Sequence, residues 1–209
     1  MAYLILVRHG ITSWNIEGKW QGLTDTPLSE EGRKQAKEIA GLLRGMKVDV
    51  VYTSELTRTK QTYEEICDGL SLACPVFYKS ALNERDYGIY TGRNKSEVER
   101  QLGHEKFMQI RRGWNYPIPQ GETLLDVYNR VVLFYQEHIL KDLKEGKNVL
   151  VISSENTLRA LMKYLENISD EDIEKFTLQF GEAFIFEFAE SGKILSKQIR
   201  ESDRSGKYR

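Results

Sequence analysis

The chain has 209 residues, a length that fits one compact domain around a single core. It is 40% hydrophobic, 11% aromatic and 29% charged, and its mean hydropathy of -0.50 excludes a membrane-spanning protein. Thirty basic and 31 acidic residues give a net charge of -1, so no global positive field points to nucleic acid. Any anion-binding site must therefore be a local pocket.

Residues that ligate metals or form disulfides are scarce. The chain has two cysteines and three histidines, which are Cys67, Cys74, His9, His104 and His138. They follow no metal-ligand spacing, so neither a zinc site nor a disulfide framework is expected. The apolar start of the chain gives way to charged residues after seven positions, unlike a signal peptide. We therefore expect a cytoplasmic protein that uses no metal.

The first half of the chain alternates between strand and helix patterns. An apolar run at 3–7 predicts a strand that is buried on both faces. Ser29 begins a helix with two glutamates in its first turn, and Gly45 ends it. The pattern then predicts a buried strand at 48–52, a helix at 57–70 and a short strand at 76–78.

The second half begins with a break in this alternation. Residues 82–121 form short helical pieces and a proline-containing loop, which predicts an insertion over one end of the sheet. A capping-box pattern at Thr123 and Asp126 begins a long amphipathic helix that Gly146 ends. The remaining predictions are a strand at 148–152, a helix at 157–165, and a strand pair at 183–188 and 194–199.

This order of elements predicts an α/β three-layer sandwich, with an open, mostly parallel sheet and helices on both faces. We expect one domain over residues 1–200, a helical and loop insertion at 82–121, and a polar tail at 201–209. Ligands of such sheets bind beyond the carboxyl ends of the strands. Polar residues follow two predicted strands, at 8–10 and 153–156, and we expect these segments to converge on one pocket.

The triplet Arg8-His9-Gly10 has a composition that suits an imidazole accepting a phosphoryl group. It combines a nucleophilic nitrogen, an adjacent permanent cation and a residue that permits close approach. By itself the triplet is weak evidence, because a lone histidine is more often structural.

Five segments in order make the signal specific. They are 6–15 (LVRHGITSWN), 21–32 (QGLTDTPLSEEG), 52–58 (YTSELTR), 82–88 (LNERDYG) and 156–161 (NTLRAL). Together they resemble the histidine phosphatase superfamily, also called the phosphoglycerate mutase-like family. The resemblance extends from residue 3 to about residue 190.

The resemblance implies a covalent phosphohistidine mechanism. His9 would attack the phosphoryl group, while Arg8, Arg58 and Asn15 hold its equatorial oxygens and Glu84 donates and accepts the proton. Phosphoryl transfer needs positioning and stabilisation of negative charge, which guanidinium groups and an amide supply without a metal.

The insertion is similar to that of the cofactor-dependent phosphoglycerate mutases. The resemblance implies that a sugar-acid substrate is bound by Tyr87, Lys95, Arg111, Arg112 and Asn156, and that 2,3-bisphosphoglycerate primes the enzyme. Three features favour the phosphatase branch instead: Gln21-Gly22, which we place among the substrate-binding residues, Thr26-Pro27, and the shorter length of the chain.

We therefore expect a phosphoglycerate mutase that interconverts 3- and 2-phosphoglycerate. The alternatives are a broad-specificity phosphomonoester phosphatase, an impaired protein that binds phosphorylated metabolites, or a chain altered to trap a complex. The expected partner is a small phosphorylated metabolite, not nucleic acid or a membrane. A homodimer is left open.

The chain departs from the family where a second histidine followed by glycine is expected. Ser154 and Glu155 stand there, and neither His104 nor His138 is a natural replacement. Loss of one preorganised donor typically lowers the rate by about 10²- to 10³-fold, and a serine hydroxyl recovers part of this. The simplest expectation is that Glu155 faces solvent. If it points inward, about 5 Å from a phosphate, the repulsion is about 3 kcal/mol per charge.

Overall fold

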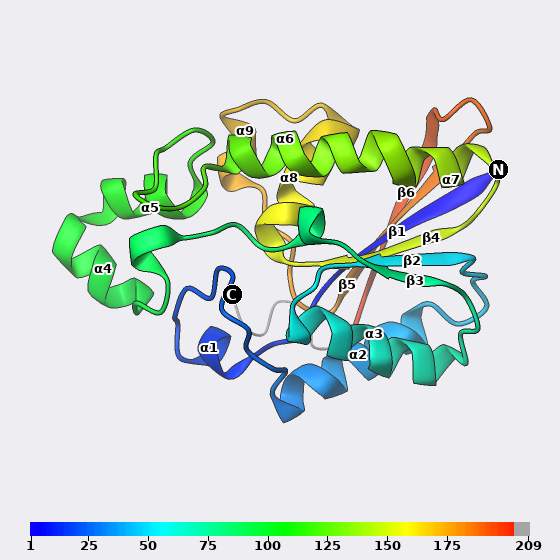
Figure 1. The fold of residues 1–209 in the computed structure, drawn as a ribbon, viewed down its shortest axis with the longest axis horizontal. Helices are drawn as coiled ribbons and strands as arrows, with labels where there is room; N and C mark the ends of the chain where they lie inside the picture. Colours follow the sequence, from blue (N-terminus) through cyan, green and yellow to red (C-terminus); the bar gives the residue numbers. More distant parts are fainter. Residues whose placement is uncertain (203–209) are drawn as a thin grey trace.

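The computed structural model describes residues 1–202, so nearly all of the predicted polar tail lies outside the described residues. Its centre is a six-stranded sheet in the order β3-β2-β4-β1-β5-β6 (Figure 1). The first four strands in this order are parallel to one another. β5 pairs antiparallel with β1, and β6 pairs antiparallel with β5. The strands are β1 (Ala2–Arg8), β2 (Val50–Thr53), β3 (Val76–Tyr78), β4 (Val149–Ser153), β5 (Glu182–Phe188) and β6 (Ile194–Glu201). The predicted open, mostly parallel sheet is confirmed.

Helices cover both faces of the sheet. Figure 1 shows α2 (Glu30–Leu42) and α3 (Thr57–Leu70) below it, and α6 (Leu124–Phe134), α7 (Leu140–Lys144) and α8 (Glu155–Glu166) on the opposite face. Leu4 and Leu6 of β1 pack into the core that contains α6 and α8, while Ile5 and Val7 pack against α2 and α3. Because both faces of β1 are buried, its sequence is continuously apolar rather than alternating.

The predicted helices differ from the observed ones at two places. The long helix after residue 123 begins with the expected capping box of Thr123 and Asp126, and a π-helical turn, Tyr135–Ile139, joins α6 to α7. The helix predicted from residue 157 begins at Glu155 instead. The earlier start puts Glu155 and Asn156 in the first turn of α8, where backbone N–H groups are free to donate.

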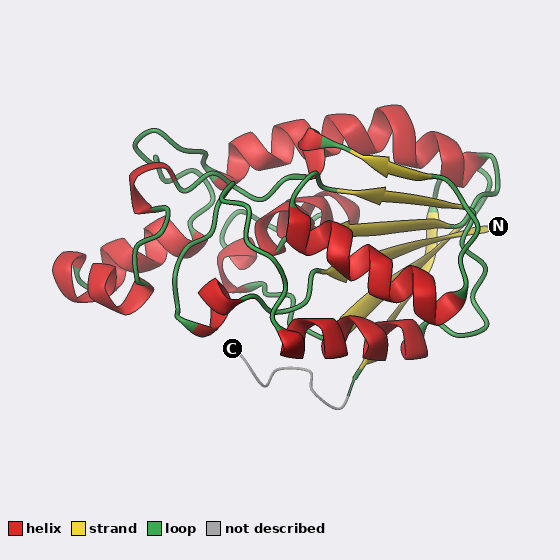
Figure 2. Cartoon of the chain, turned by 60° about the horizontal axis from the view of Figure 1, so that its bottom comes forward, coloured by secondary structure: helices red, strands yellow, loops and turns green. Residues whose placement is uncertain are grey.

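The predicted insertion lies beyond the carboxyl ends of the strands (Figures 1 and 2). It contains two 3₁₀ turns, Ser80–Leu82 and Gly88–Tyr90, and the helices α4 (Lys95–Leu102) and α5 (His104–Arg112). A separate small core that includes Trp20, Phe107 and Ile110 holds this region together. Two short helices, α1 (Ser13–Ile16) and α9 (Asp172–Lys175), complete the described chain. None of the helices in residues 1–202 has the length and apolar character needed to cross a membrane.

The loop that follows β1 is in direct backbone contact with the first turn of α2. A Cβ atom on Gly10 would lie 2.3 Å from the carbonyl oxygen of Gly32, and one on Gly32 would lie 2.1 Å from the carbonyl oxygen of Ile11. Side chains at these positions would force the two backbones apart. Two glycines therefore fix the distance between the His9 loop and α2.

The variant Gly32→Ala should lower the free energy of unfolding by about 1–3 kcal/mol, because the backbone clash outweighs the higher helix propensity of alanine. Gly41→Ala, in the same helix, is the matched control: a Cβ there meets nothing within 4 Å. It should raise stability by about 0.5–1 kcal/mol. Urea denaturation measures both, and equal shifts would contradict the close-contact argument.

Candidate active site

The pairing of β1 with β4 brings the two predicted polar segments together. Arg8 lies opposite Ser153 in the parallel register, and the backbone N–H of His9 donates to the Ser153 carbonyl at 3.0 Å. The segment after β1 and the start of α8 therefore share one edge of the sheet. This confirms the expected convergence of residues 8–10 and 153–156.

His9 is 2% exposed and lines an inner cavity at this edge. Its Nδ1 lies 2.7 Å from the Gly10 carbonyl oxygen. Because a carbonyl only accepts, Nδ1 carries the proton and Nε2 keeps its lone pair. Burial and the charges of Arg58 and Arg8 hold the pKa of His9 well below its usual value. The imidazole is therefore neutral and nucleophilic near pH 7.

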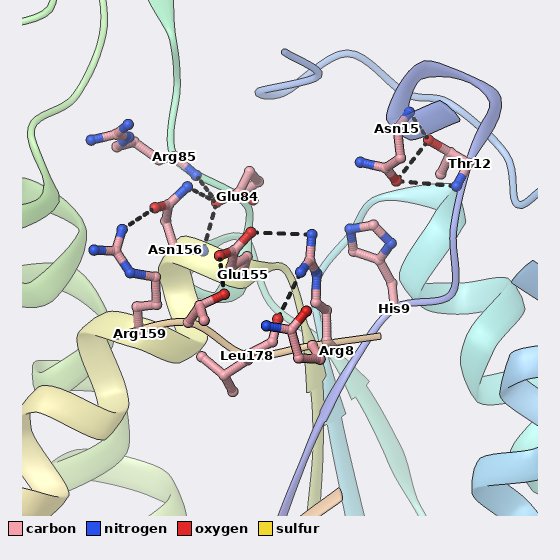
Figure 3. Close-up of polar contacts among 12 residues, drawn as sticks. Arg8, His9, Thr12, Asn15, Glu84, Arg85, Glu155, Asn156, Arg159 and Leu178 are labelled. Atoms are coloured by element: carbon pink, nitrogen blue, oxygen red, sulfur yellow. Dashed lines mark hydrogen bonds and ion pairs between the residues drawn. The ribbon is translucent and has the colours of Figure 1, made fainter. Parts of the chain in front are cut away.

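Arg8 is held by three different groups at the end of β1 (Figure 3). Its Nη1 donates to the Leu178 carbonyl at 2.7 Å, and its Nη2 lies 3.1 Å from the Glu155 carboxylate. The ring of Phe180 stacks under the guanidinium at 3.7 Å and lies edge-on to His9. Arg8 therefore has a fixed position beside His9, in contact with the cavity.

Two amide side chains present their nitrogen ends to the cavity. The oxygen of Asn15 accepts hydrogen bonds from the backbone and hydroxyl of Thr12, at 3.1 and 3.0 Å. The oxygen of Gln21 accepts from the hydroxyl of Thr26 and lies 2.8 Å from the Thr12 hydroxyl, whose single proton is shared between the two amide oxygens. Both residues line the cavity that His9 lines, together with Gly22. Because both oxygens are occupied, the NH₂ groups are the ends available to phosphoryl oxygens.

Arg58 lies close to His9 but has a different local role from Arg8. It is fully buried, and its guanidinium donates to the carbonyls of Gly22 and Thr24, both at 2.9 Å. Burial lowers the pKa of Arg58 to about 10, so the group stays charged. Arg58 does not line any of these cavities among the described residues. Its observed hydrogen bonds are instead with the loop that carries Gln21 and Gly22.

Glu84 faces the cavity from the insertion and is 8% exposed. Its Oε1 accepts from the backbone of Arg85 at 2.8 Å and from the backbone and side-chain nitrogens of Asn156 at 3.3 and 3.2 Å (Figure 3). Asn156 also donates to the Tyr87 hydroxyl at 2.9 Å. Within residues 1–202, Oε2 of Glu84 has no hydrogen-bond partner, so this oxygen can exchange a proton with a ligand.

A second cationic group lies on α4 and α5. Lys95, Arg111 and Arg112 line an outer cavity of about 550 Å³ that adjoins the inner one. Burial and the adjacent Arg111 lower the pKa of Lys95 to about 8. Neither Lys95 nor Arg111 forms an ion pair with a described residue. These two cations therefore remain available to an anionic ligand.

Two buried arginines that sequence analysis did not single out hold the end of α5. Nη2 of Arg85 donates to the carbonyls of Ile110 and Arg111, at 2.7 and 3.2 Å. Arg159 donates to the Arg112 carbonyl at 3.2 Å and to the Asn156 amide oxygen at 2.8 Å. Cations at a helix C-terminus complement its partial negative charge. Both arginines lie in segments that carried the family resemblance, which is the signal that could have identified them.

At the position of the expected second histidine, the structure contradicts the expectation that Glu155 faces solvent. Ser154 is fully buried, its hydroxyl has no partner within the described chain, and it is absent from the described cavity linings. Glu155 does not face solvent. Its carboxylate pairs with Arg8 at 3.1 Å and Arg112 at 2.6 Å and accepts from the Thr177 hydroxyl at 3.2 Å. Ser154 thus stands in place of the histidine donor, and Glu155, in place of the glycine, adds an inward-facing anion.

The other two histidines lie outside this group. His104 is exposed and contacts Glu99 at 2.7 Å, and His138 packs against Phe134 on the surface of the long helix. Among residues 1–202, no cluster of three or more His, Cys, Asp or Glu side chains could hold a metal ion.

Comparison with known proteins identifies relatives of the whole chain. A family model described as the histidine phosphatase superfamily (branch 1) matches residues 4–199. A 2,3-bisphosphoglycerate-dependent phosphoglycerate mutase of Methanosarcina acetivorans is 34% identical, with 99% of each chain covered. The solved structure of Bacillus stearothermophilus YhfR superposes with a TM-score of 0.82 at 27% identity, over 93% of this chain and 95% of that one. An alpha-ribazole phosphatase from Shigella flexneri superposes with a TM-score of 0.78 at 25% identity, over 95% of each chain.

The lowered pKa of Lys95 predicts how anion affinity depends on pH. Below about pH 8 the ammonium is charged and attracts an anion, and above it the charge is lost. Binding of sulfate, whose own charge is constant in this range, should weaken about three- to tenfold between about pH 7 and 9. The Lys95→Arg variant stays charged over this range, so its affinity for sulfate should not change with pH. Isothermal titration calorimetry measures both proteins, and an equal slope in the arginine variant would assign the effect to another group.

Proposed function

The chain belongs to branch 1 of the histidine phosphatase superfamily, and we propose that it transfers the phosphoryl group of a small phosphomonoester to Nε2 of His9. The orientation of His9 carries this proposal. Its Nδ1 proton is committed to the Gly10 carbonyl, and its lowered pKa keeps Nε2 unprotonated. An uncharged imidazole beside fixed cations is the form that attacks phosphorus.

The proposed reaction has two balanced steps. The lone pair of His9 Nε2 forms a bond to phosphorus while the ester P–O bond breaks, and Glu84 donates a proton to the leaving alcohol. A water or hydroxyl oxygen then attacks the phosphohistidine, the P–N bond breaks, and Glu84 takes the proton of the incoming group. Arg8 and the amides of Asn15 and Gln21 stabilise the charge on the phosphoryl oxygens.

Two finer activities are candidates, and the first is interconversion of 3- and 2-phosphoglycerate. Relatives named 2,3-bisphosphoglycerate-dependent phosphoglycerate mutase support this proposal. Lys95 and Arg111 supply two cations without an ion-pair partner among the described residues, which fits a substrate with a second acidic group. The same cations fit 2,3-bisphosphoglycerate, which would supply the phosphoryl group that primes His9. The participation of Tyr87 and Asn156 in substrate binding stays a prediction.

The second candidate is a phosphomonoester phosphatase. The ion pairs of Glu155 with Arg8 and Arg112 favour it, since they occupy two of the cations that a second acidic group would need. The similarity to an alpha-ribazole phosphatase supports the same class. Parallel assays of phosphoglycerate isomerisation and of phosphate release from a simple ester separate the two activities. The cytoplasmic location, the homodimer and the domain boundary at residue 200 stay predictions.

The variant His9→Gln should form no acid-labile phosphoenzyme and should lose about 10³-fold or more in turnover, because glutamine offers no nucleophilic nitrogen. His104→Gln, at an exposed position, is the matched control and should label like the original protein. Radiolabelled substrate followed by acid and base treatment of the denatured protein measures the label. A label that persists without His9 would contradict the proposed nucleophile, and no label in the unaltered protein would leave the binding-protein alternative.

The variant Glu84→Gln should lose about 10²- to 10⁴-fold in hydrolysis of an ester whose alcohol needs protonation. Phosphoenzyme formation from p-nitrophenyl phosphate should fall much less, because p-nitrophenolate leaves without a proton. Stopped-flow measurement of nitrophenolate release tests this difference. An equal loss with both substrates would show that Glu84 acts through structure rather than as an acid.

A further inference from the structure

The carboxylate of Glu155 lies where an anionic group of a ligand would bind. It lines the outer cavity, the inner cavity and the small cavity between them, and of the other described residues only Lys95 does the same. Figure 3 shows the carboxylate beside Arg8, on the side of that guanidinium away from His9. Glu155 thus stands at the boundary between the phosphoryl-binding end and the outer part of the site.

Each oxygen of this carboxylate meets a different guanidinium. Oε2 lies 3.1 Å from Nη2 of Arg8, and Oε1 lies 2.6 Å from Nη1 of Arg112. The Thr177 hydroxyl donates to Oε1 at 3.2 Å. A carboxylate that bridges two guanidinium groups in this way uses the contacts that a ligand carboxylate would otherwise make. Side chains from β1, α5 and the segment after α9 hold it, so the contact is built into the fold.

The carboxylate is ionised over the whole working range of pH. Burial alone would raise the pKa of Glu155, but the charges of Arg8, Arg112 and Arg159 outweigh it and hold the pKa far below its ordinary value. The same pair raises the pKa of Arg112 despite its burial. The competition between Glu155 and an incoming anion is therefore permanent and not a switch within physiological pH.

Besides its charged residues, the outer cavity has a neutral part that can contact an uncharged group. Its lining includes the neutral polar side chains Ser96, Thr177 and Gln179 and the aromatic rings of Phe107 and Phe180. Lys95 and Arg111 have no ion-pair partner within residues 1–202, so the site still attracts the phosphoryl dianion. The carboxylate of Glu155 repels only a second anionic group of the ligand.

We propose that Glu155 determines specificity by occupying the second anion subsite between Arg8 and Arg112. The site then discriminates against phosphomonoesters that carry a carboxylate near the phosphate and favours those whose alcohol part is uncharged, so of the two proposed activities this inference supports the phosphatase over the mutase. This inference rests on the proposed function for the identity of the phosphoryl end of the site. It needs no turnover, because it concerns the relative binding of two ligands.

The test compares 3-phosphoglycerate with glycerol 3-phosphate, which carries a hydroxymethyl group in place of the carboxylate. Isothermal titration calorimetry gives the ratio of the two dissociation constants. In Glu155→Gln this ratio should shift about 10- to 100-fold in favour of 3-phosphoglycerate, the effect expected for one nearby unit charge. Affinity for glycerol 3-phosphate should change less than the affinity for 3-phosphoglycerate.

Glu99→Gln is the matched control, because Glu99 borders the same outer cavity but has neither Arg8 nor Arg112 as an ion-pair partner. It changes the net charge equally and should leave the ratio within about twofold, because an exposed charge is screened. If Glu155→Gln shifts the ratio less than about threefold, or if Glu99→Gln shifts it equally, the proposal is wrong.

A second variant keeps the test decisive if Glu155→Gln does not fold. Glu155→Asp retains the charge on a side chain one methylene shorter, which cannot span both guanidinium groups. The ratio should then shift about three- to tenfold in the same direction, and an unchanged ratio would overturn the proposal. Failure of the His9 phosphoenzyme test would reject the proposed function separately, since the binding ratio is measured without phosphoryl transfer.

Discussion

The parallel pairing of β1 with β4 is the constraint on which the site depends. It places Arg8 opposite Ser153, so the residue that follows β1 and the first turn of α8 lie side by side although about 145 positions separate them. His9 faces one side of Arg8 and Glu155 the other. A shift of one residue in this register would turn Arg8 to the other face of the sheet and dissolve the arrangement.

Several cations lie at this edge of the sheet, and they fall into two groups. Arg58, Arg85 and Arg159 are fully buried and bond mainly to backbone carbonyls, which compensates part of their desolvation without a directly paired carboxylate. Lys95 and Arg111 are left without an ion-pair partner in the described chain, and burial together with repulsion from Arg111 lowers the pKa of Lys95. This division separates cations that hold the scaffold from cations that can bind a ligand.

Glu155 connects the two halves of the site in a way that a glycine at this position could not. It keeps Arg8 and Arg112 oriented through charge-assisted hydrogen bonds, and it adds a negative charge beside the place where phosphoryl charge gathers. Orientation and repulsion therefore come from the same carboxylate. Ser154, buried and without a partner among the described residues, contributes no donor to the cavity that would offset this charge.

The sequence by itself determined the order of strands and helices along the chain, the helix at 57–70, the capping box at Thr123 and the family, because local periodicity and ordered motifs encode them. It also indicated His9 and Arg8 as candidate site residues. Only the tertiary structure decided that Arg58 bonds to the Gln21 loop, that Arg85 and Arg159 hold the end of α5, and that Glu155 points inward. The physical reason is that a side chain's direction depends on partners from distant segments, and the helix start at Glu155 is stabilised by two arginines that no local pattern reveals.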